Sequence, residues 1–417
     1  MNLEKDVLSR LLRYAQIDTQ SDENSTSYPS SAGQWDLLRL LDRELRELGL
    51  EDVGIDEFGY VTATLPGTMS RGDGDMQVVP VVGLLAHVDT TPEVSGSGVC
   101  PHVVHDYIGG PIVLVGDATQ VISADETPHL HECIGHDIVS SDGTTLLGAD
   151  DKAGVAEIMT ALSHLVSHPE WRHGTVRVAF IPDEETGRGT EHFDVSAFGA
   201  HYAYTIDGDN PGEIEDETFC ADTAVVTFHG RNVHPGYAKG KLVNAIKLAA
   251  TLLERLPQDG LSPETTEGRE GYLHPFSIEG DSETARLSFY VRDFEVGGLA
   301  EKEHYLRRLA NEIEVSEPRA KVDVVVSESY RNTKDVLQRH PQVVANGEEA
   351  MRRAGLRPKR TLNRGGTDGC RLSFMGLPTA NIFAGGQNIH SKREWVSVQD
   401  MSKAVEVLVH LVQVWAE

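Results

Sequence analysis

The sequence predicts an α/β protein with a mostly parallel sheet, helices on both faces of that sheet, and a separate inserted α+β block. Up to about residue 218, apolar runs of strand length alternate with amphipathic helical stretches, which is typical of a covered parallel sheet. Between residues 219 and 330 the order becomes strand–helix–strand–helix–strand, and the earlier style returns from residue 331. The length of 417 residues exceeds what one ordinary core supports. We therefore expect residues 1–218 and 331–417 to fold together, with residues 219–330 inserted between them.

The first segment is expected to begin with two helices and to continue mainly with strands. Helical periodicity covers residues 3–15, 34–48 and 150–168. The expected strands are Tyr60–Leu65, Val78–Val88, Val176–Ile181 and Tyr202–Ile206. Val78–Val88 is apolar on both faces, which predicts a buried central strand. Polar residues 19–33 and the Gly/Asp-rich residues 66–77 are expected to be loops.

The inserted block and the last segment follow in the same way. In the block, strands are expected at Val225–Phe228, Leu287–Val291 and Val322–Val326, and helices at Lys241–Leu256 and Leu299–Ile313. In the last segment, helices are expected at 341–354 and 400–416 and a strand at 378–383. The acidic, polar residues 262–283 receive no assignment.

Composition excludes several classes of protein. The net charge of −28, from 37 basic and 65 acidic residues, argues against a nucleic-acid-binding protein, which needs a basic surface. An acidic surface favours metal cations and positively charged amino termini, or serves solubility or adaptation to salt alone. The longest apolar run contains Pro80 and is too short to cross a bilayer as a helix, and no secretory pattern opens the chain. We expect a cytoplasmic protein that binds no membrane; a homodimer is compatible with the sequence.

The cysteines give no sign of a structural framework. Their positions are Cys100, Cys133, Cys220 and Cys370. Because they are widely spaced and form no CxxC pair, neither disulfides nor a cysteine zinc site is expected.

Five residues suited to metal binding stand at expected strand ends or helix starts. They are His87, Asp150, Glu185, Asp207 and His390. Alone, each is readily explained as a turn residue or a helix cap. Together, two imidazoles and three carboxylates are typical ligands for two zinc or manganese ions, and Asp150 is the candidate for bridging them.

Two neighbouring acids extend this set towards catalysis. Glu184 directly precedes Glu185, and a free carboxylate there could take a proton from a water held by the metals. Asp89 lies two residues after His87, so it can reach the same side and fix the imidazole tautomer.

Other motifs are weaker or are set aside. The stretch His131–His136 nearly spells HExxH, but its second histidine comes one position late for a shared helical face. No GxSxG, Walker or helix-opening GxGxxG motif occurs. His234, between an expected strand and an expected helix, could donate to an oxyanion or be a polar turn residue. Arg364 lies in a glycine-rich turn and could bind a peptide carboxylate; Arg292 could serve similarly, although a surface salt bridge is the favoured interpretation.

Taken in order, these windows resemble the peptidase T family, the aminotripeptidase branch of the two-metal aminopeptidase, carboxypeptidase and aminoacylase superfamily. The matching windows are LLAHVDT, SSDGTTLLGADDKAGVAEIM, IPDEETGRGTEHFD, GRNVHPGYAKGKLVNAI, NRGGTDG and GGQNIHSK. The resemblance implies a phosphorylase/hydrolase-like catalytic domain at 1–218 and 331–417 and a lid domain at 219–330.

The same resemblance implies specific roles. His87 and Asp207 would hold one zinc ion, Glu185 and His390 the other, and Asp150 would bridge them; manganese or cobalt could replace zinc. Glu184 would be the general base and acid, and Asp89 would orient His87. His234 would come from the lid to the scissile carbonyl, and Arg364 and Arg292 would recognise a substrate terminus.

The expected activity is therefore metal-dependent removal of the N-terminal residue from short unblocked peptides, chiefly tripeptides. Within the superfamily, a dipeptidase, a carboxypeptidase or an N-acyl-amino-acid deacylase remains as an alternative. Outside it, the alternatives are a metal-dependent binding protein without catalysis and a purely structural acidic protein.

Overall fold

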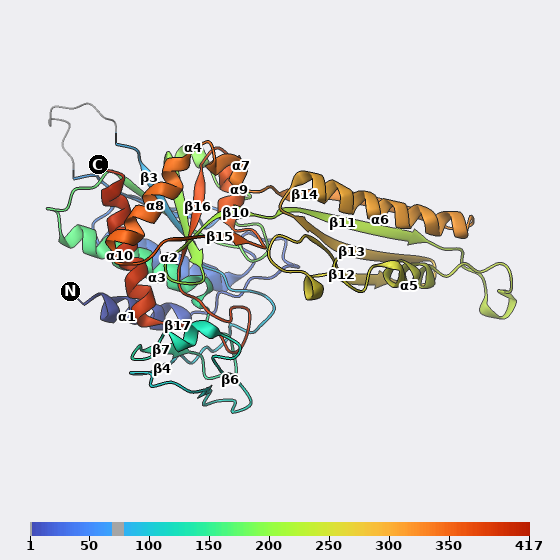
Figure 1. Ribbon diagram of the computed structural model, residues 1–417, viewed down its shortest axis with the longest axis horizontal. Coiled ribbons are helices and arrows are strands. Elements are labelled where there is room, and N and C mark those ends of the chain that lie inside the picture. The colour runs from blue at the N-terminus through green and yellow to red at the C-terminus, as the bar shows by residue number, and fades with distance from the viewer. Residues whose placement is uncertain (1, 69–78) are drawn as a thin grey trace. The chain divides into compact units, whose positions relative to one another are not determined.

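A computed structural model of the chain describes residues 2–68 and 79–417 (Figure 1). The chain forms two compact units. One comprises residues 1–216, 333–361 and 367–417, and the other comprises residues 217–332 and 362–366. The start of the expected strand Val78–Val88 and most of the expected loop 66–77 lie outside the described residues.

The larger unit is built on an eight-stranded sheet. Its strands are β1 (Glu51–Ile55), β2 (Val61–Leu65), β3 (Val82–His87), β8 (Val176–Ile181), β9 (Tyr202–Gly208), β10 (Glu213–Thr218), β15 (Lys359–Asn363) and β16 (Thr379–Phe383). They lie in the order β1-β2-β8-β3-β9-β16-β10-β15. The central pairs β8–β3, β3–β9 and β9–β16 are parallel, whereas β1–β2, β2–β8 and β10–β16 are antiparallel. The predicted α/β class is confirmed, with antiparallel strands added towards the edges.

Helices cover both faces of this sheet. They are α1 (Leu3–Ala15), α2 (Ala32–Glu47), α3 (Ala149–Ser167), α4 (Val195–Phe198), α7 (Lys334–Leu337), α8 (Pro341–Arg353), α9 (Asp368–Phe374) and α10 (Val398–Val414). In β3, Leu84 packs into the core shared with α1, α3, α8 and α10, whereas Leu85 packs with Phe198 and Leu372 on the other face. Strand alternation thus buries both faces, as the apolar run in β3 predicted. Among the described residues, no helix is long and apolar enough to cross a membrane.

A small subdomain of the larger unit was not predicted. It contains β4 (His102–Val104), β5 (Ile112–Val113), β6 (Val121–Ile122), the 3-10 helix η1 (Pro128–His131), β7 (Ile138–Ser140) and β17 (Trp395–Ser397). The strands β17, β7 and β4 form one sheet, and β5 pairs with β6. Strands of two or three residues carry too little periodicity to be recognised in sequence.

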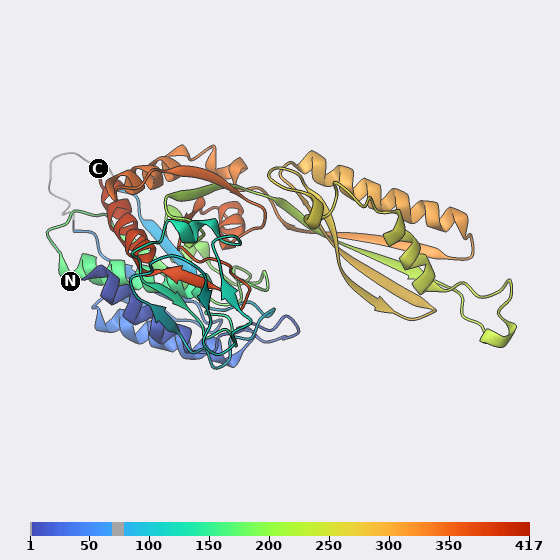
Figure 2. The same cartoon turned by 60° about the horizontal axis from the view of Figure 1, so that its bottom comes forward.

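The second unit is an antiparallel sheet packed against two helices. Its elements are β11 (Cys220–His229), the 3-10 helices η2 (Pro235–Tyr237) and η3 (Pro263–Thr265), α5 (Ala245–Arg255), β12 (Tyr272–Gly280), β13 (Thr284–Asp293), α6 (Val296–Ser316) and β14 (Lys321–Tyr330). The order is β12-β13-β11-β14, and α5 and α6 share one apolar core with this sheet (Figure 2). β12 lies in the unassigned acidic stretch: it is an edge strand with largely exposed side chains, so it lacks the usual apolar signal.

Candidate metal centre

The five residues expected to bind metal come together in the larger unit. His87 is the last residue of β3, Asp207 lies near the end of β9, and Glu185 follows β8. His390 lies in the loop after β16, and Asp150 lies at the start of α3. Because β8, β3, β9 and β16 are neighbouring parallel strands, their carboxyl ends meet at one edge of the sheet.

Asp150 lies between the two imidazoles. Its Oδ1 is 3.0 Å from Nε2 of His87, and its Oδ2 is 3.3 Å from Nε2 of His390. Nε2 of His87 is also 3.7 Å from Oδ1 of Asp207, and Nε2 of His390 is 3.0 Å from Oε2 of Glu185. The residues therefore form two groups, each with one imidazole and one carboxylate of its own, and Asp150 presents a different oxygen to each group.

The carboxylates of this cluster repel one another strongly. Burial and the neighbouring Asp150 raise the pKa of Glu185 to about 8. Burial likewise raises the pKa of Asp207 to about 6. At His390, burial lowers the pKa, but hydrogen bonds with Asp150 and Glu185 outweigh it and raise the pKa to about 11. Without a compensating cation, the cluster would thus hold protons near neutral pH.

The donor set fits two divalent cations. Oε1 of Glu185 is buried without a hydrogen-bond partner, which leaves one of its lone pairs for a ligand. Two nitrogen and three carboxylate donors match the coordination preferences of zinc, manganese and cobalt. Two sets of three residues bring one ligand atom each within 4.8 Å of one another, close enough to hold a metal ion. One set is His87, Asp150 and Glu185, and the other is His87, Asp151 and Asp207.

Asp151 is a carboxylate of this cluster to which the sequence reasoning gave no role. Its Oδ2 accepts from the backbone N–H of His87 at 3.2 Å, and its Oδ1 accepts from that of Gly154 at 3.2 Å. Burial and the charge of Asp207 raise its pKa well above the usual range. Since its oxygens accept from two backbone amides, Asp151 is placed to join the end of β3 to the start of α3.

Asp89 contacts both His87 and the residues after β8. Nδ1 of His87 is 3.1 Å from the backbone oxygen of Asp89 and 3.4 Å from its Oδ1. The Asp89 carboxylate also accepts from the backbone N–H groups of Glu184 at 3.0 Å and Glu185 at 3.1 Å. The role of Asp89 in orienting His87 stays a prediction. The structure shows in addition that Asp89 holds the backbone of Glu184 and Glu185 in place.

A second positioning contact, missed in the sequence, comes from Glu394. This buried carboxylate accepts from the backbone N–H groups of Leu147 at 2.8 Å, Gly148 at 2.6 Å and Asp150 at 2.9 Å. Glu394 lies four residues after His390, so it ties the loop carrying one ligand to the loop carrying another. Glu394 directly precedes β17 (Trp395–Ser397), and no feature of the sequence marks it as a residue that holds the ligand loops.

The remaining predicted site residues lie in the second unit. His234 precedes η2 and accepts from the N–H of Gly236 with its Nδ1 at 3.1 Å. Arg292 donates to the backbone oxygen of Asp222 at 3.1 Å. Neither contact tests a role in substrate binding, and both roles stay predictions.

Arg364 is engaged within the second unit. Its Nη1 donates to the backbone oxygens of Gly268 and Glu270, both at 2.9 Å, and its Nη2 donates to Oγ1 of Thr266 at 2.9 Å. The guanidinium also lies over the ring of Phe219. These contacts explain why residues 362–366 belong to the second unit. From the sequence, these residues were expected to belong to the last segment, 331–417.

Known proteins resemble this chain in sequence and in fold. Residues 147–414 match the family described as Peptidase family M20/M25/M40. The peptidase T of Geobacillus kaustophilus is 44% identical over 415 residues, covering 100% of this chain and 99% of that protein. The fold resembles that of aminopeptidase PepT from Bacillus cereus (TM-score 0.74, 23% identity, 99% of both chains). It also resembles the YXEP protein of Bacillus subtilis, a dinuclear metal binding peptidase (TM-score 0.63, 14% identity, 99% of this chain and 98% of that one).

Proposed function

The chain belongs to peptidase family M20/M25/M40, and on this premise we propose that it is a metal-dependent aminotripeptidase that removes the N-terminal residue from short unblocked peptides. The observation that carries the proposal is the Asp150 carboxylate, whose two oxygens face His87 and His390 separately. Full-length similarity to peptidase T supports tripeptides as the substrate class.

Glu184 is the residue we assign to proton transfer. Its backbone N–H is held by Asp89, next to the ligand candidate Glu185. Burial, together with the charges of Asp368 and Asp207, raises the pKa of Glu184 well above its usual range. A carboxylate of raised pKa accepts a proton more readily, so Glu184 is suited to take one from the attacking water and to give it to the leaving amine.

We propose two zinc ions as the cofactors, with manganese or cobalt as alternatives. Bound here, two divalent cations would lower the pKa of a water and polarise the scissile carbonyl. His87 and Asp207 would hold one ion and Glu185 and His390 the other, with Asp150 between them.

The roles in the second unit follow from the family resemblance. The unit would act as a lid, with His234 donating to the oxyanion of the scissile carbonyl. Arg292 would bind a substrate carboxylate, and Arg364 would do so only if its present contacts with residues 266–270 are exchanged. A cytoplasmic location and a homodimer also stay predictions, to be checked by cell fractionation and by light scattering.

The test is a comparison of four substrates with one enzyme preparation. A free tripeptide is assayed beside its dipeptide, its tetrapeptide and its N-acetylated form, with zinc present and after chelation. We expect chelator-sensitive cleavage of the free tripeptide, with release of its first residue and little turnover of the others.

The outcomes separate the alternatives. Cleavage of the acetylated form would indicate a deacylase, and cleavage of dipeptides alone would indicate a dipeptidase. Release of the last residue would indicate a carboxypeptidase. Metal binding without any turnover would leave a binding protein, and absence of bound metal would contradict the whole proposal.

A further inference from the structure

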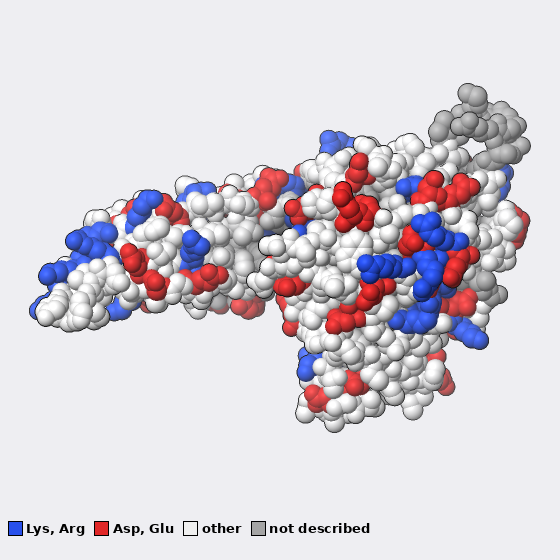
Figure 3. Space-filling view, turned by 180° about the vertical axis from the view of Figure 1, so that it is seen from behind, with Lys and Arg blue, Asp and Glu red and all other residues white. Residues whose placement is uncertain are grey.

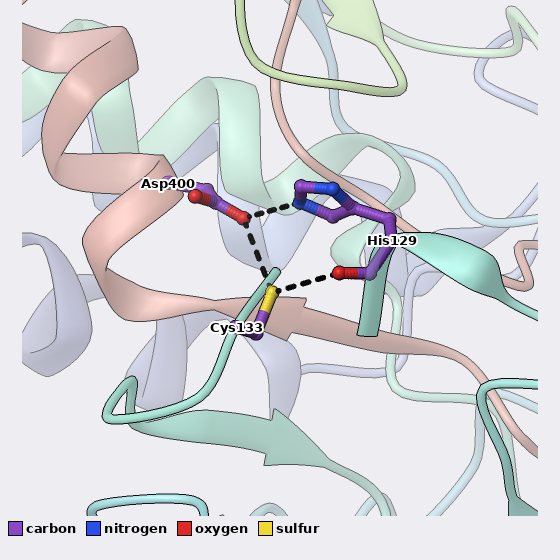
Figure 4. Close-up of side chains that lie close together, drawn as sticks. All are labelled: His129, Cys133 and Asp400. Atoms are coloured by element: carbon purple, nitrogen blue, oxygen red, sulfur yellow. Dashed lines mark hydrogen bonds and ion pairs between the residues drawn. The ribbon is translucent and has the colours of Figure 1, made fainter. Parts of the chain in front are cut away.

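A cluster of metal-binding side chains that shares no residue with the centre described above lies between the small subdomain and α10. His129 belongs to η1, Cys133 follows it by one turn, and Asp400 lies in the first turn of α10 (Figure 4). Nε2 of His129 is 2.8 Å from Oδ2 of Asp400, and Sγ of Cys133 is 3.8 Å from the same oxygen. One ligand atom from each residue lies within 4.8 Å of the others.

These separations are close to those that a tetrahedral zinc site requires. With zinc–nitrogen and zinc–oxygen bonds of about 2.0–2.1 Å and zinc–sulfur bonds of about 2.3 Å, neighbouring ligand atoms lie roughly 3.3–3.7 Å apart. A cation would need to part His129 from Asp400 by about half an ångström and to draw Cys133 slightly inward. Imidazole, thiolate and carboxylate are each common zinc ligands.

An ordinary ion pair between His129 and Asp400 accounts for only part of this arrangement. It explains the 2.8 Å contact, and the thiol of Cys133 also donates to the backbone oxygen of His129 at 3.5 Å. Neither contact requires the buried sulfur to lie 3.8 Å from the carboxylate oxygen that His129 contacts. In Figure 4 the imidazole and the sulfur approach Asp400 from different directions, as ligands around one ion do.

The surrounding charge also favours a cation. Glu157 in α3 is fully buried, and neither of its carboxylate oxygens has a hydrogen-bond partner. Burial and the charge of Asp400 raise the pKa of Glu157 well above its usual range. Nδ1 of His129 is 3.6 Å from Oε2 of Glu132, which adds a further acid on the solvent side. Because the raised pKa leaves Glu157 protonated, the negative charge at the cluster comes from Asp400 and Glu132, and a divalent cation would compensate these two carboxylates.

We propose that His129, Cys133 and Asp400 bind one divalent cation of the zinc class, which fastens the small subdomain to α10. Binding replaces the thiol proton of Cys133, which is released to solvent. His136 is the candidate for a fourth ligand, since its Nδ1 is 3.9 Å from Oδ1 of Asp400 and now contacts Oγ of Ser397 at 2.8 Å. A water could take that position instead.

A structural role suits this position. The subdomain has its own small core, which includes Leu130, Cys133, Ile138 and Trp395. So small a core stabilises a fold weakly, and metal binding is a common supplement in such cases. The widely spaced cysteines had argued against a cysteine zinc site, because that reasoning required a CxxC pair.

Cobalt substitution of the full-length protein tests the proposal directly. A thiolate bound to Co²⁺ absorbs strongly in the near ultraviolet, whereas imidazole and carboxylate ligands do not. The residues proposed for the catalytic pair include no cysteine, so this absorption would report the additional site alone. We expect the band in the wild-type protein and in Cys100→Ser, whose cysteine is exposed, and its loss in Cys133→Ser.

Metal analysis after dialysis gives an independent readout. We expect about three zinc ions per wild-type chain and about two in Cys133→Ser and His129→Gln, with tripeptide turnover unchanged if the catalytic pair is intact. Absence of the band from wild-type Co²⁺ protein would overturn the proposal even if the variants fail to fold. A band that persists in Cys133→Ser and disappears in Cys100→Ser would assign the cobalt to the surface cysteine and would overturn it as well.

Discussion

At the scale of single residues, Glu184 and Glu185 are adjacent in sequence but have different surroundings. Glu185 faces His390 at 3.0 Å, whereas the raised pKa of Glu184 suits proton transfer. We expect Glu184→Gln to keep its bound metal and to lose kcat by roughly 10²–10⁴-fold, because an amide cannot accept the proton. Turnover kinetics and metal analysis on the same sample would check this. Turnover near the wild-type level would exclude Glu184 as the base.

Glu394 is expected to act on catalysis through Asp150 without touching the substrate. Glu394→Gln replaces one accepting oxygen with a donor, so at least one of the three backbone N–H groups of Leu147, Gly148 and Asp150 loses its partner. We expect metal affinity to fall by roughly 10–100-fold and activity to recover partly at high zinc concentration.

Activity as a function of zinc concentration measures that effect. Glu126→Gln is a suitable control, because Glu126 is an exposed acid paired with Arg393 in the neighbouring turn. If Glu394→Gln lowers activity equally at all zinc concentrations, Glu394 does not act by positioning a ligand.

The sequence indicated the metal ligands better than the residues that hold them. Each of the five stands at the end of a strand, in the loop after one or at the start of a helix, and few other roles suit that combination of residue types; they are His87, Asp150, Glu185, Asp207 and His390. Asp151 and Glu394 act through backbone N–H groups, and such contacts depend on which loops meet in space. Sequence alone gives no signal for that.

At the scale of secondary-structure elements, burial decided which predictions succeeded. β3 was recognised because both of its faces are apolar, and β8 because it is apolar apart from Arg177. α1 and α2 were recognised because each has one continuous apolar stripe. β12 was missed because its side chains are mostly exposed, and the strands of the small subdomain because each has at most three residues.

The contact between α6 and β11 predicts a pH dependence in the second unit. Burial, and then a hydrogen bond with Asp222, raises the pKa of Glu303 to about 7. A carboxyl whose pKa is higher in the folded protein than the unfolded value of about 4.3 stabilises the fold at low pH, and this contribution is lost as pH rises towards 7. We therefore expect Glu303→Gln to match the wild-type melting temperature near pH 5 and to exceed it at pH 8.

Melting curves at pH 5, 6, 7 and 8 would measure the difference. Glu301→Gln is the matched control, since Glu301 lies on the same helix and is exposed. A difference in melting temperature between Glu303→Gln and the wild type that stays constant across this range would contradict the raised pKa of Glu303.

At the scale of the whole molecule, the acidic residues lie in two different environments, the exposed surface and the buried metal centre. On the face drawn in Figure 3, basic side chains lie among acidic ones. Exposed ion pairs, such as that of Arg353 with Glu417, contribute little to stability. The buried acids of the metal centre are different, because water does not screen them. Net charge alone could not predict either environment, because it does not distinguish acids on the surface from acids in the interior.

Metal removal should therefore destabilise the protein in a pH-dependent way. In metal-free protein the pKa values of Glu185, about 8, and Asp207, about 6, lie above those of the unfolded chain. The stability that these raised pKa values contribute is present below about pH 4 and is lost as pH rises through 6 and 8. The melting temperature of chelated protein should therefore fall as pH rises over this range. In zinc-loaded protein the bound cations neutralise the carboxylates, so its melting temperature should change little.

Melting temperatures of zinc-loaded and chelated protein between pH 5.5 and 8.5 would show the gap widening with pH. Zinc at a thousandfold excess over its dissociation constant would add about 4 kcal/mol to the free energy of unfolding. Asp207→Asn should narrow the gap, because it removes one of the repelling charges. Cys133→Ser serves as a second background, so that any contribution of the additional cation site is subtracted. A gap that is independent of pH would mean that carboxylate repulsion at the metal centre does not limit the stability of the metal-free fold.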